Sequence, residues 1–284
     1  MSEKTEIRQY NMTYSIKRYL PLVLILVPIL FSACSSKRHI RPGDSLEVAY
    51  EKAQRLYERG RYTDASRAFE TVLSIGRGTE IAQDAQYLLA ESYFKNRDFL
   101  IAASEYRRYY TNYPRSDRRV DAEFNEAMCY YRLSPRYKLD QTDTYRAIEL
   151  MQLFVGRYPN TPRAQEAATM IDSMRDKLAQ KEFSAAELYM RIRAFEAAAV
   201  YYDLTIDAFP ETVWAEKALA NQVFAYIKFA EVSVPSRMVE RYELAIASYQ
   251  KYLQLFPNGP NRSTVEQYYD MARDGIRSVQ AAMN

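Results

Sequence analysis

The chain has 284 residues, and its charges nearly balance, with 39 lysines and arginines against 36 aspartates and glutamates. Such a balance gives no electrostatic footprint for nucleic acid, so we expect no nucleic-acid partner. One histidine and two cysteines offer neither a pair of histidine metal ligands nor a framework of disulfides. The composition therefore favours a protein without metal, cofactor or enzymatic activity, which works by binding other molecules.

Residues 1–33 have the layout of a secretory signal. Two basic residues at 17–18 precede the apolar run YLPLVLILVPILF (19–31), which is shorter than the ~20 residues of a membrane-spanning helix. The alternatives are a transmembrane anchor or a buried core helix. Small residues, Ser32 and the alanine after it, stand directly before Cys34 and argue against both.

Cys34 and the residues before it resemble the lipobox of bacterial lipoproteins. In that motif the cysteine is acylated and becomes the first residue once the signal is cleaved. The resemblance implies that Cys34 is a lipid attachment point and that residues 34–43 form a lipidated tether. Ser35 permits export to the outer membrane, and the stretch after it has no acidic run. We expect a lipid-anchored protein at the outer membrane that faces the periplasm.

A repeat organises the chain after residue 43. Twelve residues before each proline of four aromatic–proline pairs lies an alanine, and a large side chain follows each alanine four residues later. The pairs are Tyr113-Pro114, Tyr158-Pro159, Phe209-Pro210 and Phe256-Pro257. An earlier unit keeps the same phase at Ala65 and Phe69. The spacing resembles the tetratricopeptide repeat, a helix–turn–helix of 34 residues, and Cys129 is expected to be buried within it.

The spacing predicts an all-α tetratricopeptide-repeat solenoid of five helix pairs with a C-terminal capping helix. We assign repeats 1–3 to residues 44–160, and repeats 4–5 with the capping helix to residues 161–284. The capping helix itself is expected over residues 263–283. Helix starts are predicted from capping patterns, which are Asp44 with Glu47, Thr161 with Pro162, and Ser263 with Glu266.

Three departures from the 34-residue spacing are informative. Repeat 3 is longer than the pattern, which predicts a loop at 134–143 between its helices. Repeat 5 is longer as well, which places an insert around 231–236. In repeat 4 a stretch without glycine or proline predicts one continuous helix over 162–191, about 45 Å long at 1.5 Å per residue.

Five repeats, the long helix and the lipobox together resemble the BamD-type lipoproteins of the outer-membrane β-barrel assembly machinery. The residues that carry the resemblance are QLFVGRYPNTPRAQEA (152–167) and RDKLAQKEFSAAELYMRIRAFEAAAVYYDLTIDAFP (175–210). The resemblance implies a non-enzymatic scaffold, held at the membrane by its lipid anchor. It also implies two partners, the POTRA domains of the barrel-forming subunit and unfolded outer-membrane protein precursors.

The first helices of repeats 1–3 carry an aromatic pattern. In tetratricopeptide arrays these helices line the concave surface, and all six positions that we expect to face it are aromatic. They are Tyr50, Tyr57, Tyr87, Phe94, Phe124 and Tyr131. We predict a groove for apolar segments of client chains; the alternative is that these rings pack against the neighbouring repeat.

Repeats 4 and 5 are the predicted docking half for the permanent partner, because they hold the long helix, an insert and the flanking arginines Arg191, Arg193 and Arg237. Two other functions fit a periplasmic tetratricopeptide-repeat lipoprotein. One is an envelope-division coordinator, although such proteins often carry a coiled coil before their repeats. The other is a carbohydrate-uptake binding lipoprotein, although such proteins are much longer.

Overall fold

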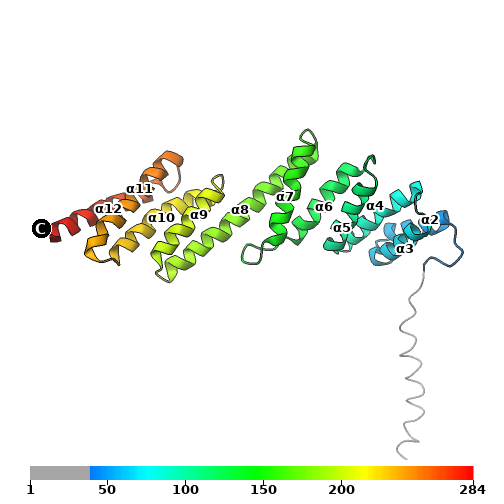
Figure 1. Cartoon of the computed structure of the whole chain (residues 1–284), viewed down its shortest axis with the longest axis horizontal. Helices are drawn as coiled ribbons and strands as arrows, with labels where there is room; N and C mark the ends of the chain where they lie inside the picture. The colour runs from blue at the N-terminus through cyan, green and yellow to red at the C-terminus, as the bar shows by residue number, and fades with distance from the viewer. Residues whose placement is uncertain (1–38, 284) are drawn as a thin grey trace, which may run out of the picture.

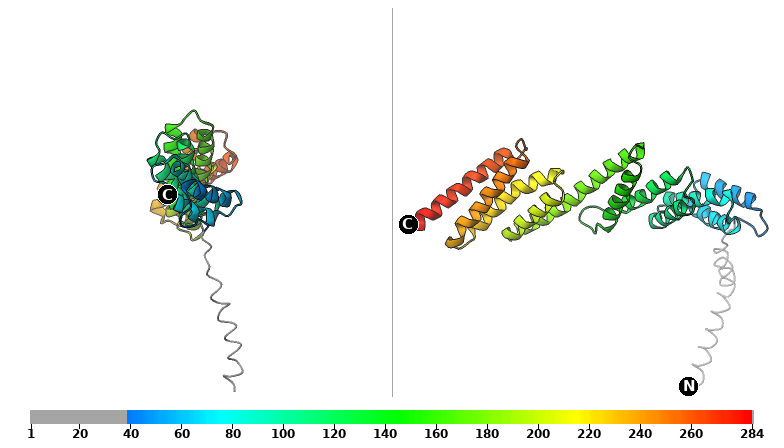
Figure 2. Two further views of the ribbon diagram at one scale, coloured as in Figure 1. Left: turned by 90° about the vertical axis from the view of Figure 1, so that its right-hand side faces the viewer. Right: turned by 45° about the horizontal axis from the view of Figure 1, so that its top comes forward.

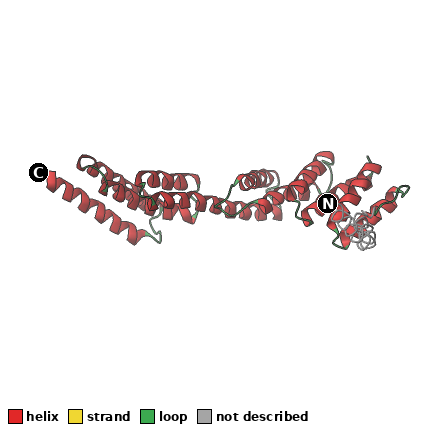
Figure 3. Ribbon diagram, turned by 90° about the horizontal axis from the view of Figure 1, so that it is seen from below, coloured by secondary structure: helices red, strands yellow, loops and turns green. Residues whose placement is uncertain are grey.

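The structure, a computed structural model, describes residues 39–283, so the predicted signal segment and the predicted lipid attachment point Cys34 lie outside the described residues. The described part is an elongated stack of helices (Figure 1), and Figure 3 shows no strand in it. The helices are α2 (Leu46–Glu58), α3 (Tyr62–Ile75), α4 (Glu80–Lys95), α5 (Phe99–Asn112), α6 (Arg119–Leu133), α7 (Thr142–Arg157), α8 (Pro162–Arg191), α9 (Phe195–Ala208), α10 (Val213–Glu231), α11 (Pro235–Leu255) and α12 (Arg262–Met283).

The helices form five consecutive antiparallel pairs, from α2 with α3 to α10 with α11, and α12 covers the last pair. Figure 2 shows the same succession from a second side and, end-on, the compact cross-section of the stack. The tetratricopeptide-repeat solenoid with a capping helix is therefore confirmed. The long helix is confirmed as well, because α8 runs from Pro162 to Arg191 and is capped by the Thr161 hydroxyl, which accepts a hydrogen bond from Ala164 N.

Two of the predicted helix starts are wrong by a residue. The cap of α2 is Ser45, whose hydroxyl accepts from Val48 N, while Asp44 pairs with Lys52 at 2.6 Å. At the other end of the chain, α12 begins at Arg262, so the serine that follows it lies inside the helix. Adjacent polar residues offer equivalent caps, and packing of the helix decides between them.

The two long repeats differ in how they use their extra residues. In repeat 3 they form a loop over 134–141, as predicted, and the last two residues of the predicted loop belong to α7. In repeat 5 only residues 232–234 lie between the helices, and the insert expected around 231–236 instead lengthens α10 and α11. Pro235 stands at the first position of α11, where its missing N–H costs nothing.

All turns within a pair lie along one edge of the rod, because every first helix runs one way and every second helix runs back. We call this the inner-turn edge; it comprises residues 59–61, 96–98, 134–141, 192–194 and 232–234. Its loops after α6, α8 and α10 run along the lower side of Figure 1. The opposite edge carries the turns between successive pairs.

The core is a series of contacts between alanines and large side chains, as the repeat spacing predicts. Ala53, Ala102 and Ala198 are fully buried, and Cys129 is buried too. One cluster joins the two halves of the rod, since Phe124 of α6 shares it with Phe209, which follows α9. None of the described helices is long and apolar enough to cross a membrane.

Candidate binding surfaces

The six predicted groove residues fall into two groups. Tyr87 and Phe124 are 8% and 2% exposed and belong to the core. The guanidinium of Arg118 lies 5.0 Å from the centre of the Tyr87 ring, and that of Arg163 lies 4.7 Å from the centre of the Phe124 ring. In the isolated chain, these two rings therefore pack against their neighbours, as the alternative interpretation predicts.

The other four, Tyr50, Tyr57, Phe94 and Tyr131, are half-buried. Each of the two tyrosines of α2 reaches the first helix of the next repeat. The hydroxyl of Tyr50 donates to Asp84 at 3.5 Å, and that of Tyr57 donates to Glu91 at 3.1 Å. Burial, followed by the neighbouring carboxylates, raises the pKa of both hydroxyls, so both remain neutral donors at neutral pH.

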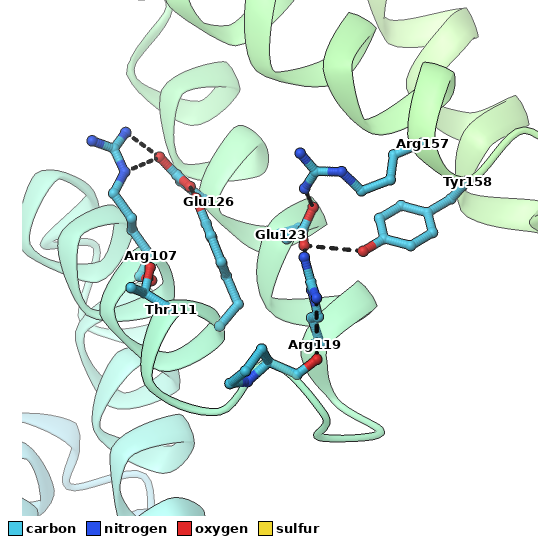
Figure 4. Close-up of polar contacts among 9 residues, drawn as sticks. Arg107, Thr111, Arg119, Glu123, Glu126, Arg157 and Tyr158 are labelled. Carbon is cyan, nitrogen blue, oxygen red and sulfur yellow. Dashed lines mark hydrogen bonds and ion pairs between the residues drawn. The ribbon is translucent and has the colours of Figure 1, made fainter.

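Between repeats 2 and 3, α6 holds two buried glutamates that arginines on both sides clamp (Figure 4). Glu126 accepts from Arg107 Nε of α5 at 2.8 Å and from the Tyr110 hydroxyl at 2.7 Å. Three residues earlier, Glu123 accepts from Arg119 Nε at 2.8 Å. The same carboxylate takes Arg157 of α7 and the hydroxyl of the next residue, Tyr158.

Both donors to Glu126 have a raised pKa. The hydrogen bond that Arg107 donates to Glu126 raises the pKa of the guanidinium, and burial, followed by the contact with Glu126, raises the pKa of Tyr110 to about 12. In these pairs the carboxylate is buried and the arginine side chain is half exposed, so they add little net stability. We expect the clamps to set how α5, α6 and α7 are placed relative to one another.

The three predicted docking arginines all lie on or beside the inner-turn edge. Arg191 is the last residue of α8 and Arg193 lies in the turn that follows, and both are exposed without an ion pair to any described residue. Arg237, in the first turn of α11, pairs with Glu240 at 2.7 Å. Exposed apolar side chains lie among them: Ile192 and Val234 are each 62% exposed.

In the described residues, no three histidine, cysteine, aspartate or glutamate side chains are placed to hold a metal ion. The Cys129 thiol is buried, and burial raises its pKa, so it stays in the unreactive neutral form. His39 lies 3.6 Å from Asp64 at the start of α3 rather than beside a nucleophile.

The sequence interpretation missed the polar contacts between repeats, although the repeat period contains a signal for them. Tyr50 and Asp84, Tyr57 and Glu91, and Asn221 and Glu187 each pair across 34 residues. Side chains one period apart occupy equivalent positions in adjacent repeats, so complementary polar types at that spacing predict contacts.

Comparison with known proteins now places the chain in a family. The family model YfiO, described as an outer membrane lipoprotein, matches residues 42–238. The chain belongs to this family. The match begins just before α2 and ends in the first turn of α11, and it confirms the resemblance to BamD-type assembly lipoproteins.

Curated relatives carry the name outer membrane protein assembly factor BamD. The one from Neisseria meningitidis serogroup B is 26% identical over 73% of this chain and 84% of its own length. The one from Caulobacter vibrioides is 23% identical over 72% of this chain and 69% of its own length. Among solved structures, a complex of the TPR2AB domain of yeast Sti1 matches 80% of this chain and 98% of its own, with 14% identity and a TM-score of 0.39.

Proposed function

We propose that this protein is a non-enzymatic scaffold of outer-membrane β-barrel assembly, anchored to the outer membrane by an acylated Cys34 and facing the periplasm. It binds the POTRA domains of the barrel-forming subunit and receives unfolded barrel precursors. The observation that supports this most is the family match over residues 42–238, which spans nine of the repeat helices, with relatives named as assembly factors. Those names give no support to a role in envelope division or carbohydrate uptake.

Client binding belongs to the first three repeats in this proposal. Half-buried rings at Tyr50, Tyr57, Phe94 and Tyr131 keep part of their surface open to an apolar segment of an unfolded chain. Aromatic rings provide a large contact area with little loss of side-chain entropy, which suits clients of varied sequence. Tyr87 and Phe124 support these rings from beneath and do not contact the client.

Docking of the permanent partner belongs to repeats 4 and 5. Arg191 and Arg193 are free cations beside the exposed Ile192, and Arg237 follows the exposed Val234. Arginine next to apolar side chains is a common composition at the centre of protein interfaces. The partner therefore covers the inner-turn edge of this half.

The partner proposal is tested by affinity purification of the full-length tagged protein from solubilised membranes, with mass spectrometry of what co-purifies. The double variant Arg191→Glu/Arg193→Glu is expected to reduce recovery of the POTRA-bearing subunit tenfold or more. A loss of about 1.4 kcal/mol of binding free energy already lowers the affinity tenfold. The control Arg77→Glu/Arg115→Glu changes the charge equally on the opposite edge and should retain it. Equal recovery with both variants contradicts the docking assignment.

The client proposal is tested by binding of an unfolded, fluorescently labelled barrel precursor. Phe94→Ala/Tyr131→Ala should weaken binding while the melting temperature changes little. Phe124→Ala is the matched control. It removes a core ring, so its main effect should be a lower melting temperature. A large loss of stability in the Phe94 and Tyr131 variant would instead identify those rings as core residues.

The anchor is tested by the mass of the mature N-terminal peptide. An acylated Cys34 at the new N-terminus is expected, and Cys34→Ser should move the protein from the membrane to the soluble fraction. An unmodified chain that still begins with residues 1–33 contradicts this part of the proposal.

A further inference from the structure

The inner-turn edge of repeats 1–3, together with the helix residues directly beside its turns, combines exposed cations with exposed apolar side chains. The cations without an ion pair to any described residue are Arg59, Lys95, Arg97, Arg136 and Lys138. Between them lie Leu100 and Leu139, which are 60% and 51% exposed. Three carboxylates, Glu58, Asp98 and Asp140, share the edge, so the cations are in excess.

The opposite edge of the same repeats has a different character. Its arginines are mostly paired, as Arg118 with Asp84 at 3.3 Å and Arg119 with Glu123 at 2.8 Å show. Among the described residues of that edge in repeats 1–3, Arg41, Arg77 and Arg115 are exposed and without an ion pair. The exposed carboxylates of Glu47, Glu80 and Asp117 lie beside them, so the excess of free positive charge is on the inner-turn edge.

The described chain also begins at this edge. His39 lies 3.6 Å from Asp64 Oδ1, and Ile40 is buried in the core of repeat 1, so the point of departure is fixed. Five residues separate Cys34 from His39, and an extended chain of that length spans at most about 17 Å. An acyl chain on Cys34 therefore holds this edge of repeat 1 close to the bilayer.

The loop of repeat 3, PRYKL within residues 134–141, is built to present its side chains at the same edge. The buried amide of Gln141 donates to the carbonyls of Arg136 and Leu139, both at 3.0 Å. Lys181 of α8 donates to the Leu139 carbonyl at 2.8 Å. These hydrogen bonds hold the backbone of the loop, and Leu139 is exposed beside Lys138.

We infer that the inner-turn edge of repeats 1–3 lies on the anionic lipid surface of the membrane that anchors the protein. Arginine and lysine bind the headgroup phosphates, while Leu100, Leu139 and the half-buried Tyr137 contact the boundary with the acyl chains. Basic residues interleaved with leucine and tyrosine are the composition of interfacial membrane contacts. This inference rests on the acylated Cys34 of the proposed function, which supplies the proximity.

The experiment uses the mature chain, residues 34–284, with Cys34→Ser so that no acyl chain contributes, and phosphatidylcholine vesicles with or without phosphatidylglycerol. Binding is expected only to the vesicles that contain phosphatidylglycerol, and it should weaken as salt rises. Arg97→Glu/Lys138→Glu should weaken it roughly thirtyfold or more, at about 1 kcal/mol per cation near an anionic surface. The matched control, Arg77→Glu/Arg115→Glu, makes the same change on the opposite edge of the same repeats and should bind as the parent does.

A fluorescent label reports which edge touches the lipid. Cys129 is fully buried, so Leu139→Cys in the same chain takes an environment-sensitive dye selectively. Its emission should shift to the blue on binding, whereas a dye at Asn112→Cys, near the opposite edge, should not shift. Equal losses in both charge variants, or no shift at residue 139, would overturn the inference.

Two outcomes separate this inference from the proposed function. If Arg97→Glu/Lys138→Glu leaves vesicle binding unchanged but loses a protein in the affinity purification, the edge is a protein interface and the inference is wrong. If the parent chain binds phosphatidylglycerol through this edge but no assembly subunit co-purifies, the inference stands and the proposed function fails.

Discussion

The two halves of the rod are held together by different means. Repeats 1–3 use helices of 13 to 16 residues, joined by polar clamps such as Arg107 with Glu126 and Arg157 with Glu123. Repeats 4–5 use helices of up to 30 residues, close apolar contacts, and glutamates held by neutral tyrosine and asparagine donors instead of arginines. At Gly275 of α12, for example, a Cβ would overlap the ring of Tyr242, so only glycine allows this approach.

The difference shows how one repeat pattern serves two mechanical purposes. Ion pairs to a buried carboxylate add little net stability, and we expect them here to fix the relative placement of the helices that carry them. Broad apolar contact supplies most of the stability of the second half, beside its neutral hydrogen bonds. We therefore expect the first half to resist changes of shape and the second half to hold most of the free energy of folding.

The largest expected effect is in the second half. Tyr252 is fully buried, and its hydroxyl donates to Glu216, which also accepts from Asn261 N at 3.1 Å. Tyr252→Ala should lower the free energy of unfolding by about 3–5 kcal/mol, because it opens a cavity and leaves a buried carboxylate short of a donor. Hydrogen exchange should show lost protection in α10, α11 and α12 but not in repeats 1–3, since repeats contact only their neighbours. Leu255→Ala, at an exposed position, is the control with no measurable loss.

Removal of a polar clamp in the first half should lower the free energy of unfolding by a smaller amount. In Glu126→Gln the side chain keeps its size but loses the charge that faces Arg107. The Arg107 side chain is itself 47% exposed, so its guanidinium can bind water instead. The free energy of unfolding should therefore fall by about 1–2 kcal/mol, as measured by a denaturant titration. Glu149→Gln, in an exposed pair with Arg146, should change stability by less than about 0.5 kcal/mol. A loss for Glu126→Gln as large as that for Tyr252→Ala would contradict the division between the halves.

The helix pairs, the long α8 and the capping α12 were all predictable, because each depends on spacings within one repeat. Residues 231–236 were misplaced for a reason in the same sequence: valine, serine and proline suggest a loop, but proline also begins helices. The length of α10 and α11 is set by their packing against α9 and α12, which no local pattern contains.

The candidate surfaces were only partly predictable. The spacing placed six rings on one face of the first helices but could not show which rings the second helix covers. Tyr109 packs against Tyr87 at 5.2 Å and Phe154 against Phe124 at 5.5 Å, and both partners come from the second helix of their repeat. Exposure of a ring depends on its neighbour across the pair, so it needs the tertiary structure.

Alkaline pH should act on the first half through its tyrosine–carboxylate contacts. Burial and then hydrogen-bonded glutamates raise the pKa of Tyr93 and Tyr110 to about 12. A raised pKa in the folded state means that this stabilisation is complete below pH ~10, the unfolded value, and is lost as the pH rises to about 12. Unfolding titrations from pH 9 to 12 should show this fall, and Tyr110→Phe should make it shallower. Identical curves for the parent and the variant would show that Tyr110 is not involved.

The smallest expected effect separates the surfaces of the two halves. Gly60, Arg97 and Arg193 occupy the same place in their turns with φ of 72°, 69° and 63°, a conformation that costs non-glycine residues about 1–2 kcal/mol. Arg97→Gly and Arg193→Gly should each raise the free energy of unfolding by about 0.5–1 kcal/mol, once the greater chain entropy of glycine is subtracted. The two variants should lose different functions. Arg97→Gly should weaken binding to phosphatidylglycerol vesicles, and Arg193→Gly should weaken recovery of the assembly subunit. If the two variants gain stability and keep both activities, the arginines at these strained positions serve neither surface.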